Sequence, residues 1–271
     1  MSADTPNLVV ALREARAIAA DAGLVLMEGY RRRGVIRKKG PADLVTDFDV
    51  RSEELIRSRL RLAFPSHVIV GEEGGSEGGN VTDESFVWYV DPLDGTTSFA
   101  HGHPYFSVSI GLCRGSEPLL GVVLAPALAI TWHAIRGEGS FRNGERCHVS
   151  ATATFEDALC ATGFPGHPDN PQDDNMREFA AFNARTHGVR RCGSAAVDLA
   201  MVADGTHEIY WQRRLNAWDV AAGVLLVTEA GGRVSNHQGG DVHPRSGEFL
   251  ATNGHLHAEA IWLLREQGTV P

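Results

Sequence analysis

The sequence predicts a layered fold of the α+β or α/β class, in which sheets alternate with layers of helices. Two observations support this prediction. Residues 1–148 contain strand-like runs separated by turn residues, typical of an antiparallel meander, whereas residues 149–271 alternate strand and helix patterns. No repeat, low-complexity tract or long linker separates the halves. We therefore expect residues 1–271 to form one domain, with any functional site between its halves.

The first half is expected to begin with helices and continue with strands. Apolar residues three or four positions apart predict an amphipathic helix over 8–28, and a second near 50–63 follows the turn-rich stretch 43–49. Residues 71–83 are rich in glycine and polar residues, which predicts a mobile loop. Asn143-Gly144 predicts a hairpin turn. Strands are predicted over 67–70, 86–90 (stopping at Asp91-Pro92), 106–113, 119–125 and 129–135.

In the second half of the chain, strands and helices are expected to alternate. Strands are predicted near 158–162, 189–192, 207–211, 232–235 and 248–252. Helices are predicted near 173–186, 194–203, 218–230 and 255–266.

Composition limits the possible functions. The formal net charge of −9 argues against a nucleic-acid surface, which needs a basic stripe to replace phosphate counterions. No run of 18 apolar residues could span a membrane, and the N-terminus lacks the plan of a signal peptide. The four cysteines have no CxxC spacing, which is typical of reduced thiols. We expect an acidic, soluble, cytoplasmic protein.

One motif combines carboxylates with anion-binding groups. In the segment DPLDGTTSF (91–99), a buried strand delivers Asp91 and Asp94 into a tight turn. The backbone N–H groups of Gly95, Thr96 and Thr97 and the two threonine hydroxyls follow it. Carboxylate and carbonyl oxygens are the ligands that Mg²⁺ prefers, and adjoining N–H groups bind anions. The alternative is a purely structural turn, because Pro-x-Asp-Gly is common turn chemistry.

Three further acidic positions are ambiguous when each is taken alone. Glu72 lies in Gly71-Glu72-Glu73 at the end of a predicted strand, where it could equally be part of a solvated loop. Asp219 and Asp49 each stand at the start of a predicted helix, where an aspartate most often serves as an N-cap.

Taken together, the motifs resemble the inositol monophosphatase family over essentially the whole chain. The segments that carry the resemblance are DLVTDFD (43–49), GEE (71–73), DPLDGTTSF (91–99), ATGFP (161–165), RRCGSAAVDLA (190–200) and WDVAAGVLLVTEAGG (218–232). The resemblance implies an αβαβα sandwich like that of fructose-1,6-bisphosphatase. It also implies a homodimeric, lithium-sensitive, Mg²⁺-dependent phosphomonoesterase. Such an enzyme hydrolyses inositol monophosphate or a related polyol or sugar phosphate through metal-activated water.

The resemblance also implies roles for individual residues. Two or three Mg²⁺ ions would be held by Glu72, Asp91, the Leu93 carbonyl, Asp94 and Asp219. Glu72 and Thr96, the latter oriented by Asp49, would activate the attacking water, and the leaving group would be protonated near Asp94. The N–H groups of Gly95 and Thr96 would bind phosphate. The inositol ring would contact Asp94, Gly193, Ser194 and Ala195. Lys38 matches a family lysine near a mobile active-site loop.

The sequence departs from the family pattern where the substrate would bind. The inositol-binding glutamate of the family is Gln212 here, followed by Arg213 and Arg214, and Ser98 replaces an asparagine. The added positive charge leaves open a substrate with an extra anion. The alternatives are histidinol phosphate, fructose 1,6-bisphosphate and 3′(2′),5′-bisphosphate nucleotides. A regulatory binding role beside catalysis also remains open.

Overall fold

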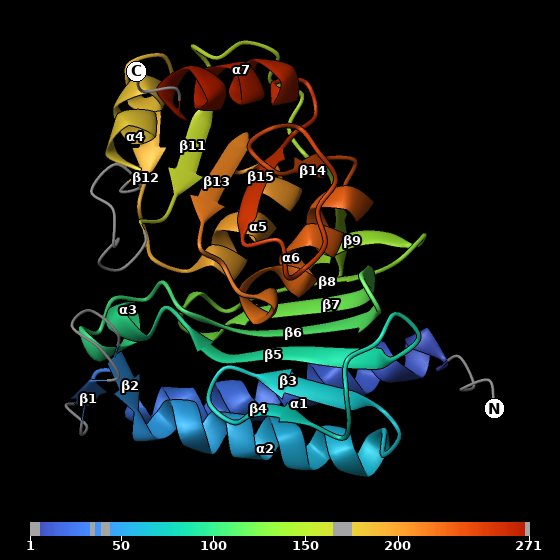
Figure 1. Cartoon of the computed structure of the whole chain (residues 1–271). Coiled ribbons are helices and arrows are strands. Elements are labelled where there is room, and N and C mark those ends of the chain that lie inside the picture. The colour runs from blue at the N-terminus through green and yellow to red at the C-terminus, as the bar shows by residue number, and fades with distance from the viewer. Residues whose placement is uncertain (1–5, 33–35, 39–43, 165–174, 269–271) are drawn as a thin grey trace.

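The computed structural model describes residues 6–32, 36–38, 44–164 and 175–268. Five layers follow one another: a pair of helices, a large sheet, a second pair of helices, a smaller sheet and a third pair of helices (Figure 1). This αβαβα arrangement confirms the fold class expected from the sequence.

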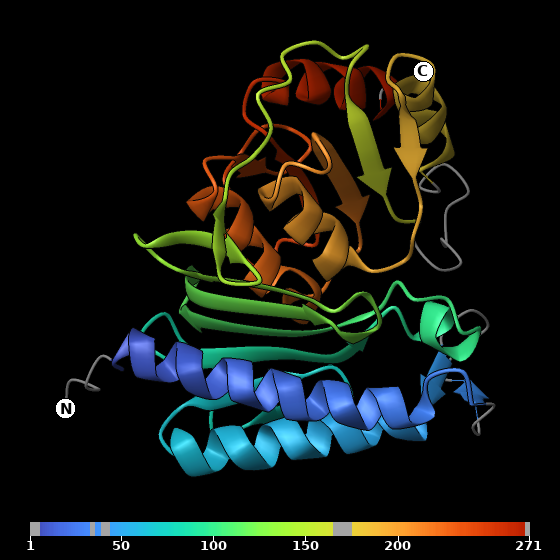
Figure 2. The same ribbon diagram turned by 180° about the vertical axis from the view of Figure 1, so that it is seen from behind.

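The first helix layer covers one face of the large sheet, as Figure 2 shows from behind. It consists of α1 (Leu8–Gly29) and α2 (Asp47–Ala63). The buried side of α1 includes Ala11, Ala15, Ala19 and Ala22, small residues that allow the helix to approach its neighbours closely. The second helix begins at Asp47, earlier than expected, because Thr46 is its N-cap and accepts a hydrogen bond from Phe48 N.

The large sheet has eight strands. They are β3 (Val68–Gly71), β4 (Gly75–Glu77), β5 (Phe86–Asp94), β6 (Ser107–Arg114), β7 (Glu117–Ala125), β8 (Ile130–Ile135), β9 (Gly139–Arg142) and β10 (Glu145–Cys147). Their order is β10-β9-β8-β7-β6-β5-β3-β4. All neighbours are antiparallel except β3 and β5. The predicted meander and the Asn143-Gly144 turn, with both residues at positive φ, are therefore confirmed.

Two predictions for this sheet were wrong. Residues 75–77, expected within a loop, form β4 and pair with β3; β4 is the edge strand, so it has no need of an apolar alternation. Strand β5 does not stop at Asp91 but runs through Pro92 to Asp94. The register shifts between Asp91 and Asp94, and at such an irregularity the missing N–H of a proline is tolerated.

The second half supplies the other three layers. Helices α5 (Ala195–Ala203) and α6 (Ala217–Glu229) lie between the sheets, and α4 (Met176–Asn183) and α7 (His257–Gly268) lie on the far side (Figure 1). The small sheet contains β11 (Leu159–Thr162), β12 (Gly188–Arg190), β13 (Ile209–Arg213), β14 (Arg233–Ser235) and β15 (Glu248–Thr252). Its order is β12-β11-β13-β15-β14, with β11 parallel to both of its neighbours.

Shorter elements complete the described chain. They are β1 (Ile36–Lys38), β2 (Leu44–Thr46), α3 (Thr96–Ala100) and a 3₁₀ turn at Pro126–Leu128. Strands β1 and β2 pair antiparallel, which corrects the prediction of a turn-rich stretch up to Asp49. Strands of three residues are too short to show the alternation of apolar and polar residues by which a strand is recognised in a sequence. Within the described residues, no helix is both long and apolar enough to cross a membrane.

The central helix α6 lies directly against the large sheet. A Cβ atom at Gly121 of β7 would lie 2.7 Å from the Ala222 carbonyl oxygen, and one at Gly111 of β6 would lie 2.8 Å from Ala221 Cβ. Glycine is therefore needed at both strand positions. This close packing brings the start of α6, which carries Asp219, to the region where β5 ends.

Candidate active site

The end of β5 delivers two aspartates into the space between the halves. Asp91 is 2% exposed, and its Oδ1 accepts a hydrogen bond from Leu93 N at 3.0 Å. Ser52 of α2 donates to the Pro92 carbonyl oxygen at 3.0 Å. The turn that carries Asp91 and Asp94 is thus held both internally and from the first helix layer.

Asp94 is bonded to the second half of the chain. Its Oδ2 accepts from Ser194 Oγ at 2.6 Å and from Ala196 N at 2.7 Å, at the beginning of α5. Ser194 is buried, caps α5 and lies 3.2 Å from Ser107 Oγ. Burial raises the pKa of Asp94 to about 6, although the hydrogen bonds from Ser194 and Ala196 oppose this shift.

Asp219 occupies the third position of α6, not its N-cap. Asn216 is the N-cap, and its backbone N donates to Asp219 Oδ2 at 2.7 Å, so Asp219 takes part in a capping box. The prediction that Asp219 caps the helix is therefore confirmed as a role, but the N-cap itself is Asn216, three residues earlier. Burial raises the pKa of Asp219 well above its usual value, and the charges of Asp94 and Glu72 raise it further.

Asp91 completes a group of four interacting carboxylates. Burial raises the pKa of Asp91 well above the usual value. The charges of Glu72, Asp94 and Asp219 raise it further. Neighbouring carboxylates thus disfavour ionisation of Asp91 and Asp219, and a cation among them would relieve that repulsion. The donor set of carboxylates with a backbone carbonyl fits a hard cation such as Mg²⁺.

The carboxylates do not form a closed cage by themselves. Within residues 6–32, 36–38, 44–164 and 175–268, no three His, Cys, Asp or Glu side chains are grouped closely enough to hold a metal ion. Ligands from the backbone or from water would have to complete the coordination shell, as is usual for Mg²⁺.

A hydroxyl–carboxylate pair lies beside these acids. Thr96 Oγ1 lies 3.0 Å from Asp49 Oδ1 and 3.1 Å from the Leu93 carbonyl oxygen. Asp49 is the third residue of α2 and accepts from the N and Oγ1 atoms of Thr46 at 2.8 and 2.6 Å, so it too belongs to a capping box rather than being the N-cap. Burial raises the pKa of Asp49, and these hydrogen bonds lower it in part.

Gly95 provides the bend that leads into Thr96. Its φ of 94° lies in the left-handed region. A Cβ there would approach the carbonyl oxygens of Tyr105 and Gly193 to 2.9 and 3.0 Å. Glycine is therefore required, and the N–H groups that begin α3 are free of intrahelical partners.

The sequence matches the inositol monophosphatase family over residues 9–269. The chain belongs to this family. It is 43% identical over 257 residues to the chloroplastic phosphatase IMPL1 of Arabidopsis thaliana, which covers 92% of this chain and 69% of the relative. It is 42% identical to the Nus factor SuhB of Pseudomonas aeruginosa over 92% of each chain. The solved inositol monophosphatase from Anabaena (Nostoc) sp. PCC 7120 superposes with a TM-score of 0.88 at 37% identity, over 98% of each chain.

Membership in the inositol monophosphatase family confirms the resemblance and makes this protein a phosphomonoesterase. The residues expected to bind substrate are only partly brought together. Gln212 accepts a hydrogen bond from Tyr210 Oη at 2.8 Å. Arg213 pairs with Glu178 at 2.7 Å and with Glu248 at 3.5 Å, so the charge of this residue, one of the two arginines expected to attract an extra anion, is compensated.

Three other predicted positions, Ser98, Gly193 and Ala195, lie beside this family site. Ser98 donates to the Cys192 carbonyl oxygen at 3.1 Å and so joins the two halves. Gly193, the next residue after Cys192, has a backbone φ of 93°, in the left-handed region. Ala195 is buried at the beginning of α5. Lys38 ends β1, and Asp43 lies outside the described residues.

Sequence reasoning missed two charged residues of this site, Glu53 and Arg57 of α2. Glu53 accepts hydrogen bonds from Glu73 N and Gly74 N, directly after Glu72. A signal was present, because Glu53 and Arg57 fall on the same helical stripe as the buried Ile56 and Leu60. Two charged residues on an inward-facing stripe indicate a buried ion pair.

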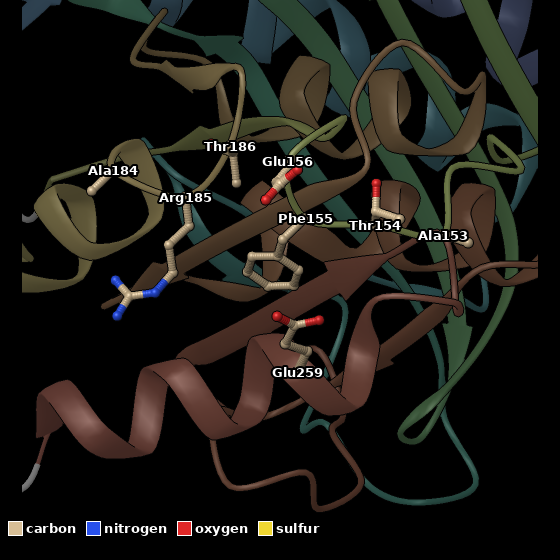
Figure 3. Close-up of a pocket in the computed structure, with 8 residues that line it drawn as sticks. All are labelled: Ala153, Thr154, Phe155, Glu156, Ala184, Arg185, Thr186 and Glu259. Carbon is tan, nitrogen blue, oxygen red and sulfur yellow. The ribbon is translucent and has the colours of Figure 1, made fainter.

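A hollow in this inositol monophosphatase fold lies away from the carboxylates. It is a cavity of about 740 Å³ between the segment 153–156, the end of α4 and α7. Figure 3 shows Glu156 and Glu259 on opposite sides of Phe155, with the Arg185 guanidinium directed away. None of the predicted site residues lines this cavity, so its size does not make it the catalytic site.

Proposed function

We propose that this protein is a Mg²⁺-dependent phosphomonoesterase that hydrolyses inositol monophosphate or a related polyol or sugar phosphate. The observation that carries the proposal is the group of four interacting carboxylates, Glu72, Asp91, Asp94 and Asp219, contributed by both halves of the chain. Repulsion within such a group favours divalent cations, and phosphoryl transfer relies on them.

The ions would be held by these four carboxylates and the Leu93 carbonyl, with two or three ions in the site. When bound, Mg²⁺ supplies positive charge that makes water more acidic and stabilises charge on the phosphoryl group. Asp91 and Asp94, on one turn, and Asp219, on α6, would fix the ions from two directions.

The chain's own groups would orient water and phosphate. Thr96 Oγ1 has one proton and donates it to Asp49 or to the Leu93 carbonyl oxygen, which leaves its lone pairs to accept a hydrogen bond from the attacking water. Glu72 would take the proton from that water. The N–H groups of Gly95 and Thr96 would bind phosphate oxygens, and the leaving oxygen would depart near Asp94.

Substrate selection would depend on the beginning of α5 and on β13. We propose that Asp94, Gly193, Ser194 and Ala195 face the polyol. Gln212 would accept from or donate to its hydroxyl groups. Because Arg213 is compensated by two glutamates, a monophosphate is favoured over a bisphosphate. We further propose a cytoplasmic homodimer that is inhibited by Li⁺.

The test is a panel of phosphate esters assayed with Mg²⁺ and with EDTA. The panel contains inositol 1-phosphate, histidinol phosphate, fructose 1,6-bisphosphate, a 3′,5′-bisphosphate nucleotide and an aryl phosphate. We expect Mg²⁺-dependent turnover that is fastest with inositol 1-phosphate and is lost in Asp94→Asn. Turnover of inositol 1-phosphate no faster than that of the aryl phosphate would refute the substrate assignment.

A second candidate is a regulatory binding role beside catalysis. It is supported by the 42% identity over 92% of both chains with a relative named Nus factor SuhB. Asp94→Asn separates the two roles. A biological effect that survives this substitution, in a protein without phosphatase activity, would favour binding, whereas its loss would favour catalysis.

A further inference from the structure

Glu53 and Arg57 form a buried ion pair that the proposed mechanism does not use. Glu53 is 2% exposed and Arg57 is 9% exposed, on the side of α2 that faces the large sheet. Arg57 Nε donates to Glu53 Oε1 at 2.7 Å, across one helical turn. The pair is buried next to the hairpin between β3 and β4.

The remaining polar atoms of the pair bind the turn and the second strand of that hairpin. Glu53 Oε2 accepts from Glu73 N at 2.8 Å, and Oε1 accepts from Gly74 N at 2.7 Å. Arg57 Nη1 pairs with Glu77 at 3.3 Å, and Nη2 donates to the Gly75 carbonyl oxygen. Two side chains of α2 therefore contact the hairpin from its first turn to its last residue.

These contacts fix the peptide that follows Glu72. The N–H of Glu73 belongs to the planar peptide unit that begins at the Glu72 carbonyl, so its hydrogen bond to Glu53 sets the orientation of that plane. A Cβ at Gly71 would lie 2.6 Å from Glu53 Oε1, and one at Gly74 would lie 2.9 Å from the same atom. The chain on both sides of Glu72 is thus closely fitted to the Glu53 carboxylate.

Stability alone is a poor explanation for this arrangement. A buried ion pair often contributes little compared with apolar residues of the same volume, because both charges lose their hydration. Here the desolvated carboxylate is satisfied by backbone donors of one particular loop conformation. Arg57 also compensates its charge, so Glu53 does not add to the repulsion among the four site carboxylates.

We infer that Glu53 and Arg57 are positioning residues that hold the Glu72 carboxylate in place for a divalent cation, an inference that rests on the proposed function. Groups that orient metal ligands typically affect metal affinity or activity by about 10- to 100-fold when they are replaced.

The experiment is a titration of the metal-free protein with Mn²⁺ alone, followed by electron paramagnetic resonance. We expect Glu53→Gln to raise the Kd for Mn²⁺ about tenfold, because an amide cannot accept both backbone N–H bonds with its two terminal atoms and leaves Arg57 with Glu77 as its carboxylate partner, at 3.3 Å. Asp21→Asn is the matched control. It removes one negative charge from another ion pair of α2, the pair of Asp21 with Arg59 at 2.5 Å, which does not contact the hairpin.

The outcomes are distinct. A Kd in folded Glu53→Gln within twofold of that in Asp21→Asn overturns the positioning role, even if Glu53→Gln lowers the unfolding midpoint. If Glu53→Gln does not fold, Arg57→Lys replaces it, since lysine keeps the charge but cannot make the three contacts at once. A wild-type protein that neither binds Mn²⁺ nor hydrolyses phosphate esters refutes the proposed function itself.

Discussion

Thr96 lies where one hydroxyl can link a carboxylate to a reacting water. Its Oγ1 is within hydrogen-bond distance of Asp49 and of the Leu93 carbonyl, so both acceptors compete for a single proton. Asp49 is itself held by two bonds from Thr46 and therefore cannot turn away. The hydroxyl is thus fixed at this position, which is the geometric condition for orienting water.

Replacing this hydroxyl tests its role directly. We expect Thr96→Ala to lower kcat for inositol 1-phosphate by about a hundredfold, a typical loss when a group that assists proton transfer is removed. Thr96→Ser keeps the hydroxyl and should retain most of the rate. Steady-state kinetics at saturating Mg²⁺ provide the measurement. Equal rates in the alanine and serine variants would contradict this role.

Gln212 is the residue at which we expect a substitution to alter substrate preference. Gln212→Glu keeps the shape of the side chain, so it still accepts from Tyr210, but it offers polyol hydroxyls a charged acceptor. Hydrogen bonds to charged groups exceed neutral ones by roughly 1 kcal/mol, which corresponds to about a fivefold gain in kcat/KM for inositol 1-phosphate over an aryl phosphate. The exposed Gln238→Glu is the matched control. No change in this ratio would exclude contact between Gln212 and the ring.

A site residue could be predicted from the sequence when the residues it acts with lie near it along the chain. Asp91 and Asp94 were predictable because one short motif carries both, together with the turn that exposes them. The bond from Ser194 to Asp94 spans 100 residues, and no local pattern encodes it. Such a contact exists only because α5 packs between two sheets.

At the scale of elements, the long periodic segments were predictable and the ends were not. Helix α4 was expected from residue 173, yet it begins at Met176. Asn175 stands before it with φ of 65°, and its side chain accepts from Trp211 Nε1 at 2.7 Å and donates to Thr162. A left-handed residue cannot belong to the helix, and the partners that stabilise it come from two strands of the small sheet.

The beginning of α7 joins three elements through one histidine. His257, which is 1% exposed, lies 2.9 Å from Thr252 Oγ1 of β15 and 2.9 Å from Ser235 Oγ of β14. Burial lowers its pKa from 6.5 to about 4, with a smaller contribution from Arg233. The folded state thus favours the neutral ring, so its contribution to stability is complete above about pH 6.5 and is lost as the pH falls towards 4.

This sign gives a prediction for acid stability. Between pH 7.5 and 5.0, we expect the free energy of unfolding of the wild type to fall by about 2 kcal/mol more than that of His257→Gln. Urea unfolding at both pH values measures the difference. Substitution of the exposed His101 by Gln is the control and should follow the wild type. Parallel losses in the wild type and His257→Gln would show that His257 does not account for the effect.

At the scale of the molecule, the central helices connect both sheets into one core. A single apolar cluster includes Val123 and Trp132 of the large sheet, Leu225 of α6, and Tyr210 and Phe249 of the small sheet. An opening of either sheet alone would expose the faces of α5 and α6 to water. The hydrophobic cost of such an opening is shared by both halves.

We therefore predict that the halves unfold together as a single domain. Native-state hydrogen exchange should give β6 and β7 the same free energy of opening as β13 and β15, equal to the global value from urea. Exchange of the small sheet at a clearly lower free energy would mean that the second half opens as an independent unit.

The proposed metal site would link these halves electrostatically as well, because Asp91 and Asp94 belong to the first half and Asp219 to the second. Without cations the mutual repulsion of the carboxylates opposes folding, so in EDTA at neutral pH we expect Asp219→Asn to raise the unfolding temperature.

With Mg²⁺ at about 100 times its Kd, the free energy of unfolding of the wild type should rise by about 2.7 kcal/mol, which raises its unfolding temperature by roughly 5–10 °C. Asp219→Asn should gain much less. Differential scanning calorimetry measures both effects. An equal Mg²⁺ shift in the two proteins would mean that Asp219 is not a ligand, and a lower temperature for the variant in EDTA would mean that its carboxylate stabilises the fold without a metal.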